Sequence, residues 1–241
     1  MLKIALPSGK SLEAGTIKLF ENSFISIKRE GDSSNQIIFP DYSDIKFGKF
    51  IKPGRIPKLV ENGAYDVAIT GLDVVLESES NVEICTRLTY GRSSEGNTRG
   101  VLFASKNDTI KTVNEIPKDS VILSEYPVLT KKFFQENGLS DVVVVASVGS
   151  VEAEVPDQYR FGLCLSETGK SLRENNLKEI ATVFTSYTVL VANKESLKDK
   201  NKREAINALK RSLLGTLEAE PCLLLTMNVP LASQDEVIEL L

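Results

Sequence analysis

Short apolar runs alternate with amphipathic or turn-rich segments along most of the chain. Runs rich in β-branched or aliphatic residues predict buried strands at Leu2–Leu6, Val67–Ile69, Val101–Ala104, Val121–Ser124, Val142–Ala146, Leu163–Leu165 and Val183–Val191. Helices are expected between them, at about Ser11–Glu21, Ile56–Gly63, Leu129–Asn137 and Ser171–Asn176. This alternation is typical of an α/β protein with mostly parallel strands.

At two segments we expect the chain to pass from one domain to the other. Tyr90–Arg99 is rich in Gly, Ser and Asn, and a second crossing is expected near Ala181. Residues 1–90 and 182–215 would then form lobe I, and residues 91–181 would form lobe II. Such an arrangement leaves a cleft between the lobes, where small ligands usually bind.

The carboxyl-terminal part predicts a helix, a strand and a second helix. Lys202–Leu217 places its apolar side chains on one helical face, Cys222–Val229 has the pattern of a strand, and Ser233–Leu241 that of a helix with a serine N-cap. Residues 216–241 are too few for a core of their own, so they pack on the lobes or begin a further domain.

Charge and hydropathy exclude several classes of protein. The 241 residues carry a net charge of −4 with both signs interspersed, so no basic face for nucleic acid is expected. The start, MLKIALPSGK, has no signal-peptide pattern, and no run reaches the roughly 18 apolar residues of a membrane span. We therefore expect a cytoplasmic protein with no membrane partner. The three cysteines lie far apart in apolar runs, which predicts buried free thiols.

The chain contains no histidine. A Ser-His-Asp triad, a Cys-His pair and a histidine zinc site are therefore all excluded. Any chemistry must depend on carboxylates, lysine, arginine, tyrosine, hydroxyl groups, backbone amides or a bound cation.

The most informative motif is Ser166-Glu167-Thr168-Gly169-Lys170-Ser171, between an expected strand and an expected helix. Its glycine allows successive amides to face one concavity, and its hydroxyls and lysine favour a phosphate there. An ordinary capped turn between strand and helix has the same local pattern. A Walker A loop is excluded, because the glycine it requires five residues before Gly169 is Cys164.

Three other turns follow expected strands in the same way. They are Pro7-Ser8-Gly9-Lys10, Thr70-Gly71-Leu72-Asp73 and Gly149-Ser150-Val151-Glu152. Ligands of open α/β sheets bind at the carboxyl ends of strands, although each turn alone is equally compatible with a structural role. Four such turns together are much more specific than one.

These motifs also resemble one family in order and spacing. IALPSGKSL, PKLVENGAYDVAITGLDVVLE, SEYPVLTKKFFQENG, GSVE and SETGKSLRENNLKEI are similar to segments of ATP phosphoribosyltransferases, the first enzymes of histidine biosynthesis. LTMNVPLASQDEVIELL resembles the start of the ferredoxin-like regulatory domain in the family's long form.

The resemblance implies a fold, a reaction and a set of site residues. The fold would be two α/β lobes like those of periplasmic binding proteins, and the reaction would join phosphoribosyl pyrophosphate to N1 of ATP with release of pyrophosphate, aided by Mg²⁺ whose ligands the sequence does not identify. By resemblance, Glu167, Thr168, Gly169, Lys170 and Ser171 hold the phosphoribosyl donor, Glu152 and Lys10 serve catalysis, and Gly9, Thr70, Gly71, Asp73 and Arg99 line the cleft.

Some positions depart from the family pattern. Cys164 replaces an aspartate that should engage the ribose hydroxyls, and Arg160 and Arg55 stand where acids are usual. A non-catalytic homologue that only binds a nucleotide or phosphosugar, for example as a regulatory subunit, is therefore the alternative. A periplasmic solute-binding protein is a third option, against which the absence of a signal peptide argues. The resemblance also implies a homo-oligomer, a dimer or hexamer, with a regulatory partner subunit possible.

Overall fold

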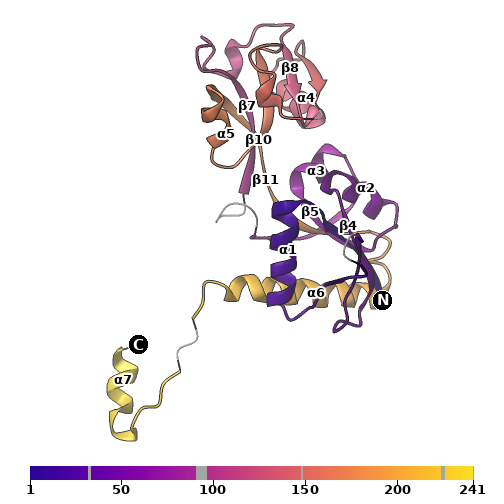
Figure 1. Ribbon diagram of the computed structural model, residues 1–241, viewed down its shortest axis with the longest axis vertical. Helices are drawn as coiled ribbons and strands as arrows, with labels where there is room; N and C mark the ends of the chain where they lie inside the picture. Colours follow the sequence, from indigo (N-terminus) through magenta and orange to yellow (C-terminus); the bar gives the residue numbers. More distant parts are fainter. Residues whose placement is uncertain (32–33, 91–96, 148, 224–225, 241) are drawn as a thin grey trace.

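The computed structural model describes residues 1–31, 34–90, 97–147, 149–223 and 226–240, apart from the side chains of residues 10, 11, 235 and 240 (Figure 1). Within these ranges the chain forms two α/β lobes, as the sequence predicts, and the long strand β11 (Leu177–Ala192) runs from one lobe to the other. No helix of the described part is long and apolar enough to cross a membrane.

Lobe I is built around a mixed sheet whose strand β1 lies between two parallel neighbours, β4 and β5. Its strands are β1 (Leu2–Pro7), β2 (Lys28–Arg29), β3 (Gln36–Ile38), β4 (Ile45–Ile51), β5 (Val67–Gly71), β6 (Glu83–Leu88) and the end of β11 (Leu177–Ala192). Its helices are α1 (Lys10–Asn22), α2 (Ile56–Glu61), α3 (Leu72–Glu77) and α6 (Lys200–Ala219), preceded at α2 by the 3₁₀ helix η1 (Pro53–Arg55).

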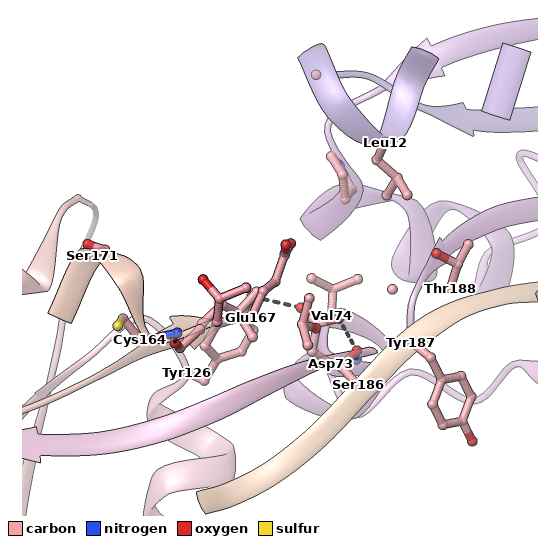
Figure 2. A pocket seen from close by; sticks show the side chains of 18 of the residues that line it. Leu12, Asp73, Val74, Tyr126, Cys164, Glu167, Ser171, Ser186, Tyr187 and Thr188 are labelled. Carbon is pink, nitrogen blue, oxygen red and sulfur yellow. Dashed lines mark hydrogen bonds between the residues drawn. The ribbon is translucent and has the colours of Figure 1, made fainter. Parts of the chain in front are cut away.

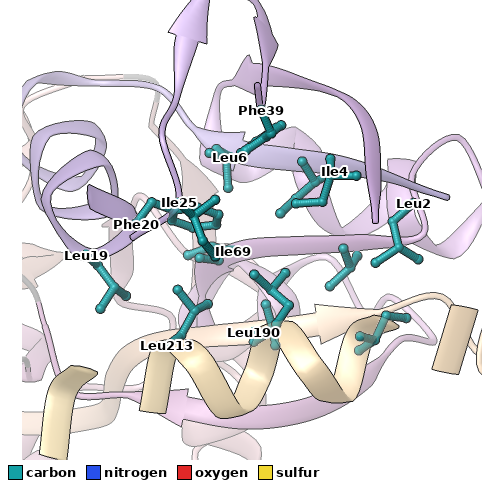
Figure 3. Close-up of a cluster of buried hydrophobic side chains, with 14 of the residues drawn as sticks. Leu2, Ile4, Leu6, Leu19, Phe20, Ile25, Phe39, Ile69, Leu190 and Leu213 are labelled. Atoms are coloured by element: carbon teal, nitrogen blue, oxygen red, sulfur yellow. The ribbon is translucent and has the colours of Figure 1, made fainter. Parts of the chain in front are cut away.

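Successive side chains of a strand point to opposite faces of the sheet, which explains why helices cover both faces of this one. In β5, Val67 and Ile69 belong to the core that also contains side chains of α1 and α6, where Figure 3 shows Ile69. Ala68 packs in the other core, with side chains of α2 and α3. The apolar face of α6 enters the first of these cores, with Ile206, Leu209 and Leu213 buried, which confirms the amphipathic helix expected there. The turn after each parallel strand is thereby held on a well-packed core.

Lobe II has the same layered construction. Its strands are β7 (Asn97–Ser105), β8 (Val121–Ser124), β9 (Val143–Ala146), β10 (Phe161–Ser166) and the first part of β11; its helices are α4 (Pro127–Glu136), α5 (Lys170–Glu174) and the 3₁₀ helices η2 (Val113–Glu115) and η3 (Val151–Ala153). Leu172 of α5 packs on one face of the sheet and Phe134 of α4 on the other. Both helices begin at the carboxyl ends of strands.

Strand β11 connects the two lobes. From Leu177 to Tyr187 it pairs with β7 of lobe II, and from Thr188 to Ala192 it pairs with β5 and β6 of lobe I. The change of partner between Tyr187 and Thr188 marks one connection between the lobes. The return connection, from β6 to β7, contains residues 91–96, which lie outside the described part.

The carboxyl-terminal segment differs from the sequence prediction. The strand expected at Cys222–Val229 is wrong, because the described residues of that stretch have no strand partner and form an irregular connection. The 3₁₀ helix η4 (Leu231–Ser233) and α7 (Gln234–Leu240) follow, apart from both lobes (Figure 1). Cys222 is exposed, so the expectation that all three thiols are buried is also wrong for this one.

Candidate active site

A cleft of about 440 Å³ lies between the two lobes (Figure 2). Lobe I contributes the turns after β1 and β5, and lobe II contributes the turn after β10 and the helix η3. The described residues that line it include Ser8, Gly9, Leu12, Pro53, Gly71, Asp73, Val74, Thr98, Tyr126, Glu152, Cys164 to Leu172, and Ser186 to Thr188. Nine of the sequence-predicted site residues are thus brought together: Gly9, Gly71, Asp73, Glu152, Glu167, Thr168, Gly169, Lys170 and Ser171.

The loop after β10 is held open by local hydrogen bonds. Gly169 has the left-handed backbone conformation, with φ of +69°, and its N–H donates to the Ser166 hydroxyl at 3.1 Å. Arg173 donates to the carbonyl of Thr168 at 2.8 Å from within α5. A Cβ at position 169 would approach the side-chain ends of Arg173 and Glu179 at 2.9 Å, so these two side chains would have to shift, and the positive φ itself favours glycine there. The result is a braced turn with backbone amides at the edge of the cleft.

The turn after β1 supplies the facing wall from lobe I. Gly9 is in the positive-φ region at +119°, and its N–H donates to the Glu13 carboxylate at 3.1 Å, which closes the first turn of α1. Lys10 is the first residue of α1, so its backbone begins the helix at this turn, while its side chain lies outside the described residues.

Asp73 is the most firmly held acid of the cleft. It is 7% exposed, and its carboxylate accepts hydrogen bonds from the Ser186 hydroxyl at 2.5 Å and from the Tyr126 hydroxyl at 2.7 Å (Figure 2). Burial, followed by the charge of Asp73, raises the pKa of Tyr126, so this phenol stays a donor. Thr70, in β5, is fully buried and donates to the Pro53 carbonyl at 3.3 Å, and it is absent from the described lining.

Acids surround the thiol of Cys164 beneath the loop. Cys164 is 2% exposed, and burial together with the nearby charges of Glu152 and Glu125 raises the pKa of its thiol. Glu152 accepts a hydrogen bond from the Ser171 hydroxyl at 2.9 Å. Burial, opposed by a bond from the Leu165 N–H, raises the pKa of Glu125, to which the charge of Glu152 also contributes. Carboxylates therefore stand beside the position where the family's aspartate is replaced.

Three arginines singled out from the sequence have places outside the cleft lining. Arg99 donates to Glu179 at 3.0 Å and to Thr182 at 3.1 Å, beneath the loop. Arg160 forms a two-point pair with Asp108, at 2.7 and 3.0 Å, and lowers the pKa of that carboxyl to about 2. Arg55 ends the exposed 3₁₀ helix η1. Arg160 is thus part of an ion pair with Asp108 and does not line the cleft.

A preformed all-protein metal centre is absent from the described residues, which contain no cluster of three or more His, Cys, Asp or Glu side chains that could hold an ion. Mg²⁺ commonly binds through one or two carboxylates together with substrate phosphates. Glu152 and Glu167 line the cleft and offer oxygen donors of that kind.

Comparison with known proteins decides the family. The family described as HisG, ATP phosphoribosyltransferase, matches residues 52–215. An ATP phosphoribosyltransferase from Pelotomaculum thermopropionicum is 34% identical over 241 residues, which cover 100% of this chain and 81% of that protein. The chain belongs to the ATP phosphoribosyltransferase family.

Solved structures agree with this fold. A chain of the ATP phosphoribosyl transferase (HisG:HisZ) complex from Thermotoga maritima superposes with a TM-score of 0.76 at 24% identity, over 91% of this chain and 100% of that one. The alkanesulfonate-binding protein SsuA from Xanthomonas axonopodis pv. citri, bound to MOPS, superposes with a TM-score of 0.56 at 8% identity, over 89% and 72%. The predicted likeness to periplasmic binding proteins is confirmed at the level of fold.

Sequence reasoning missed several residues of the transferase cleft. Tyr126 and Ser186 reach Asp73 from 53 and 113 positions away in the chain, so no local pattern could connect them. Glu125 and Tyr126 do lie in the segment SEYPVLTKKFFQENG that carries the family resemblance. Their position directly after a buried strand is the signal that could have marked them.

Proposed function

We propose that this protein transfers the phosphoribosyl group of phosphoribosyl pyrophosphate to N1 of ATP and releases pyrophosphate, the first step of histidine biosynthesis. The observation that carries the proposal is the braced loop from Ser166 to Ser171, whose left-handed Gly169 and backbone amides border a cleft between two lobes. Backbone amides arranged in this way can bind an anion, such as a phosphate linked to a sugar.

The 5′-phosphate of the donor is assigned to this loop. The backbone amides at the start of α5, the hydroxyl of Thr168 and the charge of Lys170 all favour a phosphate there. Glu167 belongs to the same loop, and its side chain lines the cleft (Figure 2). This arrangement holds the donor by its phosphate and leaves its anomeric carbon free to face lobe I.

ATP is assigned to the wall formed by lobe I. Gly9 and Gly71 allow close approach to the backbone, and Asp73 presents a fixed carboxylate within the cleft. N1 of adenine is itself a nucleophile, so a site without histidine is chemically sufficient. Catalysis then depends on orientation of the two substrates and on stabilisation of charge. Lys10, at the start of α1, is the proposed cation for phosphates on this side.

Glu152 is the proposed acid that stabilises positive charge at the sugar. Its bond to Ser171 fixes its carboxylate beside the phosphate loop. Mg²⁺ would be held by Glu152 or Glu167 together with the pyrophosphate, and it would supply neutralisation of the leaving group. The oxygen-rich lining fits this ion better than a softer metal.

The assembly and the cellular setting extend the proposal. By similarity to the family, we expect a homo-oligomer that acts in the cytoplasm on ATP and phosphoribosyl pyrophosphate. The similar chain from Thermotoga maritima is part of a HisG:HisZ complex, which supports a search for a regulatory partner of this chain.

One assay tests the reaction. The full chain is mixed with ATP, phosphoribosyl pyrophosphate and Mg²⁺, and pyrophosphate release is followed together with the absorbance of the N1-substituted adenine. Turnover that requires all three components supports the proposal. Binding of both substrates without turnover would instead favour the non-catalytic homologue, for which the replacement of an acid by Cys164 is the specific observation.

A further inference from the structure

Helix α3 of lobe I carries two acids that both bind the start of α4 in lobe II. Asp73 and Glu77 are four residues apart, so they lie one turn apart on the same face of α3. Asp73 bonds with Tyr126, and Glu77 bonds with Val128 and Leu129. The two carboxylates therefore connect the lobes over a single turn of each helix.

Glu77 satisfies backbone donors that α4 cannot satisfy itself. The first N–H groups of a helix have no partner within the helix, and α4 begins with Pro127, which has no N–H. One carboxylate oxygen of Glu77 accepts the Val128 N–H at 2.9 Å, and the other accepts the Leu129 N–H at 3.0 Å. The cap of α4 thus comes from the opposite lobe, and it is lost if the lobes separate.

Asp73 connects the same contact to the strand that joins the lobes. Its second oxygen accepts the Ser186 hydroxyl, and its own N–H donates to that hydroxyl at 2.9 Å (Figure 2). Ser186 lies two residues before Thr188, where β11 has changed its partner from lobe II to lobe I. The position of Asp73 is therefore coupled to the connection between the lobes as well as to Tyr126.

The contact also separates two cavities. Val74 and Tyr126 line both the main cleft and a second cavity of about 520 Å³ between the lobes, which Glu77 and Glu125 also border. Tyr126 packs edge-on against Phe184 of β11, with ring centroids 5.2 Å apart. Movement of α3 away from α4 would join these cavities and open the floor of the main cleft.

We propose that Asp73 and Glu77, with residues 126–129, form an inter-lobe clasp that sets how far the cleft closes, and that Glu77 is a positioning residue within it. Two carboxylates one helical turn apart repel each other, and their bonds to α4 offset that repulsion only while the lobes are closed. Release of the clasp leaves Glu77 and the N–H groups of Val128 and Leu129 with water alone as partner, while Asp73 loses Tyr126 and keeps Ser186. Closure is therefore favoured by this one contact, whatever reaction the cleft carries out.

Amide hydrogen exchange tests the clasp directly. In the full chain, Glu77→Ala is expected to speed exchange of the Val128 and Leu129 N–H groups by at least about tenfold, while the amides of residues 131–134 change little. Glu77→Gln keeps an acceptor oxygen, so it should restore part of the protection. Glu61→Ala is the matched control, because Glu61 accepts the Asn81 N–H at 2.8 Å entirely within lobe I.

A kinetic measurement distinguishes positioning from general loss of stability. If the clasp holds the closed state, Glu77→Ala raises the KM of both substrates by a common factor, because each binds only the closed fraction. Glu61→Ala should leave both KM values as in the wild type. Unchanged exchange at Val128 and Leu129 in Glu77→Ala, or equal effects of the two variants, would overturn the clasp. The exchange result stands even for a chain without turnover, so it is independent of the proposed reaction.

Discussion

The hydroxyl of Ser171 donates a 2.9 Å hydrogen bond to the carboxylate of Glu152. This bond connects the first turn of α5 with the 3₁₀ helix η3, so that the phosphate loop and the nearest acid of lobe II are fixed relative to each other. Both side chains line the cleft. A charge at Glu152 is thereby oriented toward the sugar that the loop is proposed to hold.

Glu152→Gln is expected to lower kcat by about 100-fold with little change in KM, because a charge that acts mainly in the transition state is removed while the shape is kept. Ser171→Ala should lower kcat by about tenfold, because it removes the hydrogen bond that orients the Glu152 carboxylate. Steady-state kinetics of the two variants measures both effects. An unaltered kcat in Glu152→Gln would remove this acid from the mechanism.

Asp66→Ala is expected to reduce the free energy of unfolding by about 3 kcal/mol. Asp66 is 2% exposed, and it accepts bonds of 2.7 Å from the Lys3 N–H, the Ser196 hydroxyl and the Lys202 ammonium, which join β1, β5 and α6. Urea denaturation measures the loss. Asp199→Ala, which removes the N-cap of α6, should cost only about 1 kcal/mol, and equal costs would contradict a special role for Asp66.

The central strands of lobe I could be predicted from the sequence, because β1, β5 and the end of β11 are apolar runs buried between helices. Val67–Ile69 was found within β5 for that reason. Strands β2, β3, β4 and β6 could not, because many of their residues are exposed and polar. The start of β11, from Leu177 to Thr182, was not predicted as a strand, because most of these residues are only partly buried or exposed and show no regular alternation. It is a strand because it pairs with β7, and tertiary pairing overrides local preference. The converse holds for Cys222–Val229, where strand-like residues have no sheet to join.

The site was predictable where it follows strand ends and unpredictable where it depends on partners distant in sequence. Gly169 and Gly9 both lie in the turns expected after strands, and both have a positive φ. Arg99 was expected in the cleft, but Glu179 is its partner across β7 and β11. Only the three-dimensional pairing of those strands brings the two side chains together.

The ion pair between Asp108 and Arg160 should make a contribution to the free energy of unfolding that depends on pH. The bond from Arg160 holds the pKa of Asp108 at about 2, below its ordinary value of 3.8. A carboxyl group whose pKa is lower in the folded protein stabilises the fold at pH values above its ordinary pKa. This contribution is lost as the pH falls from about 4 to about 2. The difference in free energy of unfolding between wild type and Asp108→Asn should therefore be constant near neutrality and shrink in that window. A difference independent of pH would contradict the pairing.

The three thiols should react in a fixed order. Cys222 is exposed, Cys85 is partly buried with its pKa raised to about 11 by burial, and Cys164 is buried among acids that raise its thiol pKa further. An aromatic disulfide reagent at about pH 8 should label Cys222 rapidly and the other two only on unfolding. Mass spectrometry identifies the labelled peptide, and rapid labelling of Cys164 would contradict its burial beneath the loop.

Calorimetric titration with phosphoribosyl pyrophosphate and Mg²⁺ tests most directly whether the backbone around Gly169 binds the phosphoribosyl donor. Gly169 and Gly138 have nearly the same left-handed backbone, with φ of +69° and +73°, but only at position 169 would an added carbon meet other side chains, at 2.9 Å. Gly169→Ala should lose at least about tenfold in donor affinity, whereas Gly138→Ala, which carries the same kind of backbone strain, should bind as the wild type does. Equal affinities in the two variants, or no donor binding by the wild type, would contradict the account.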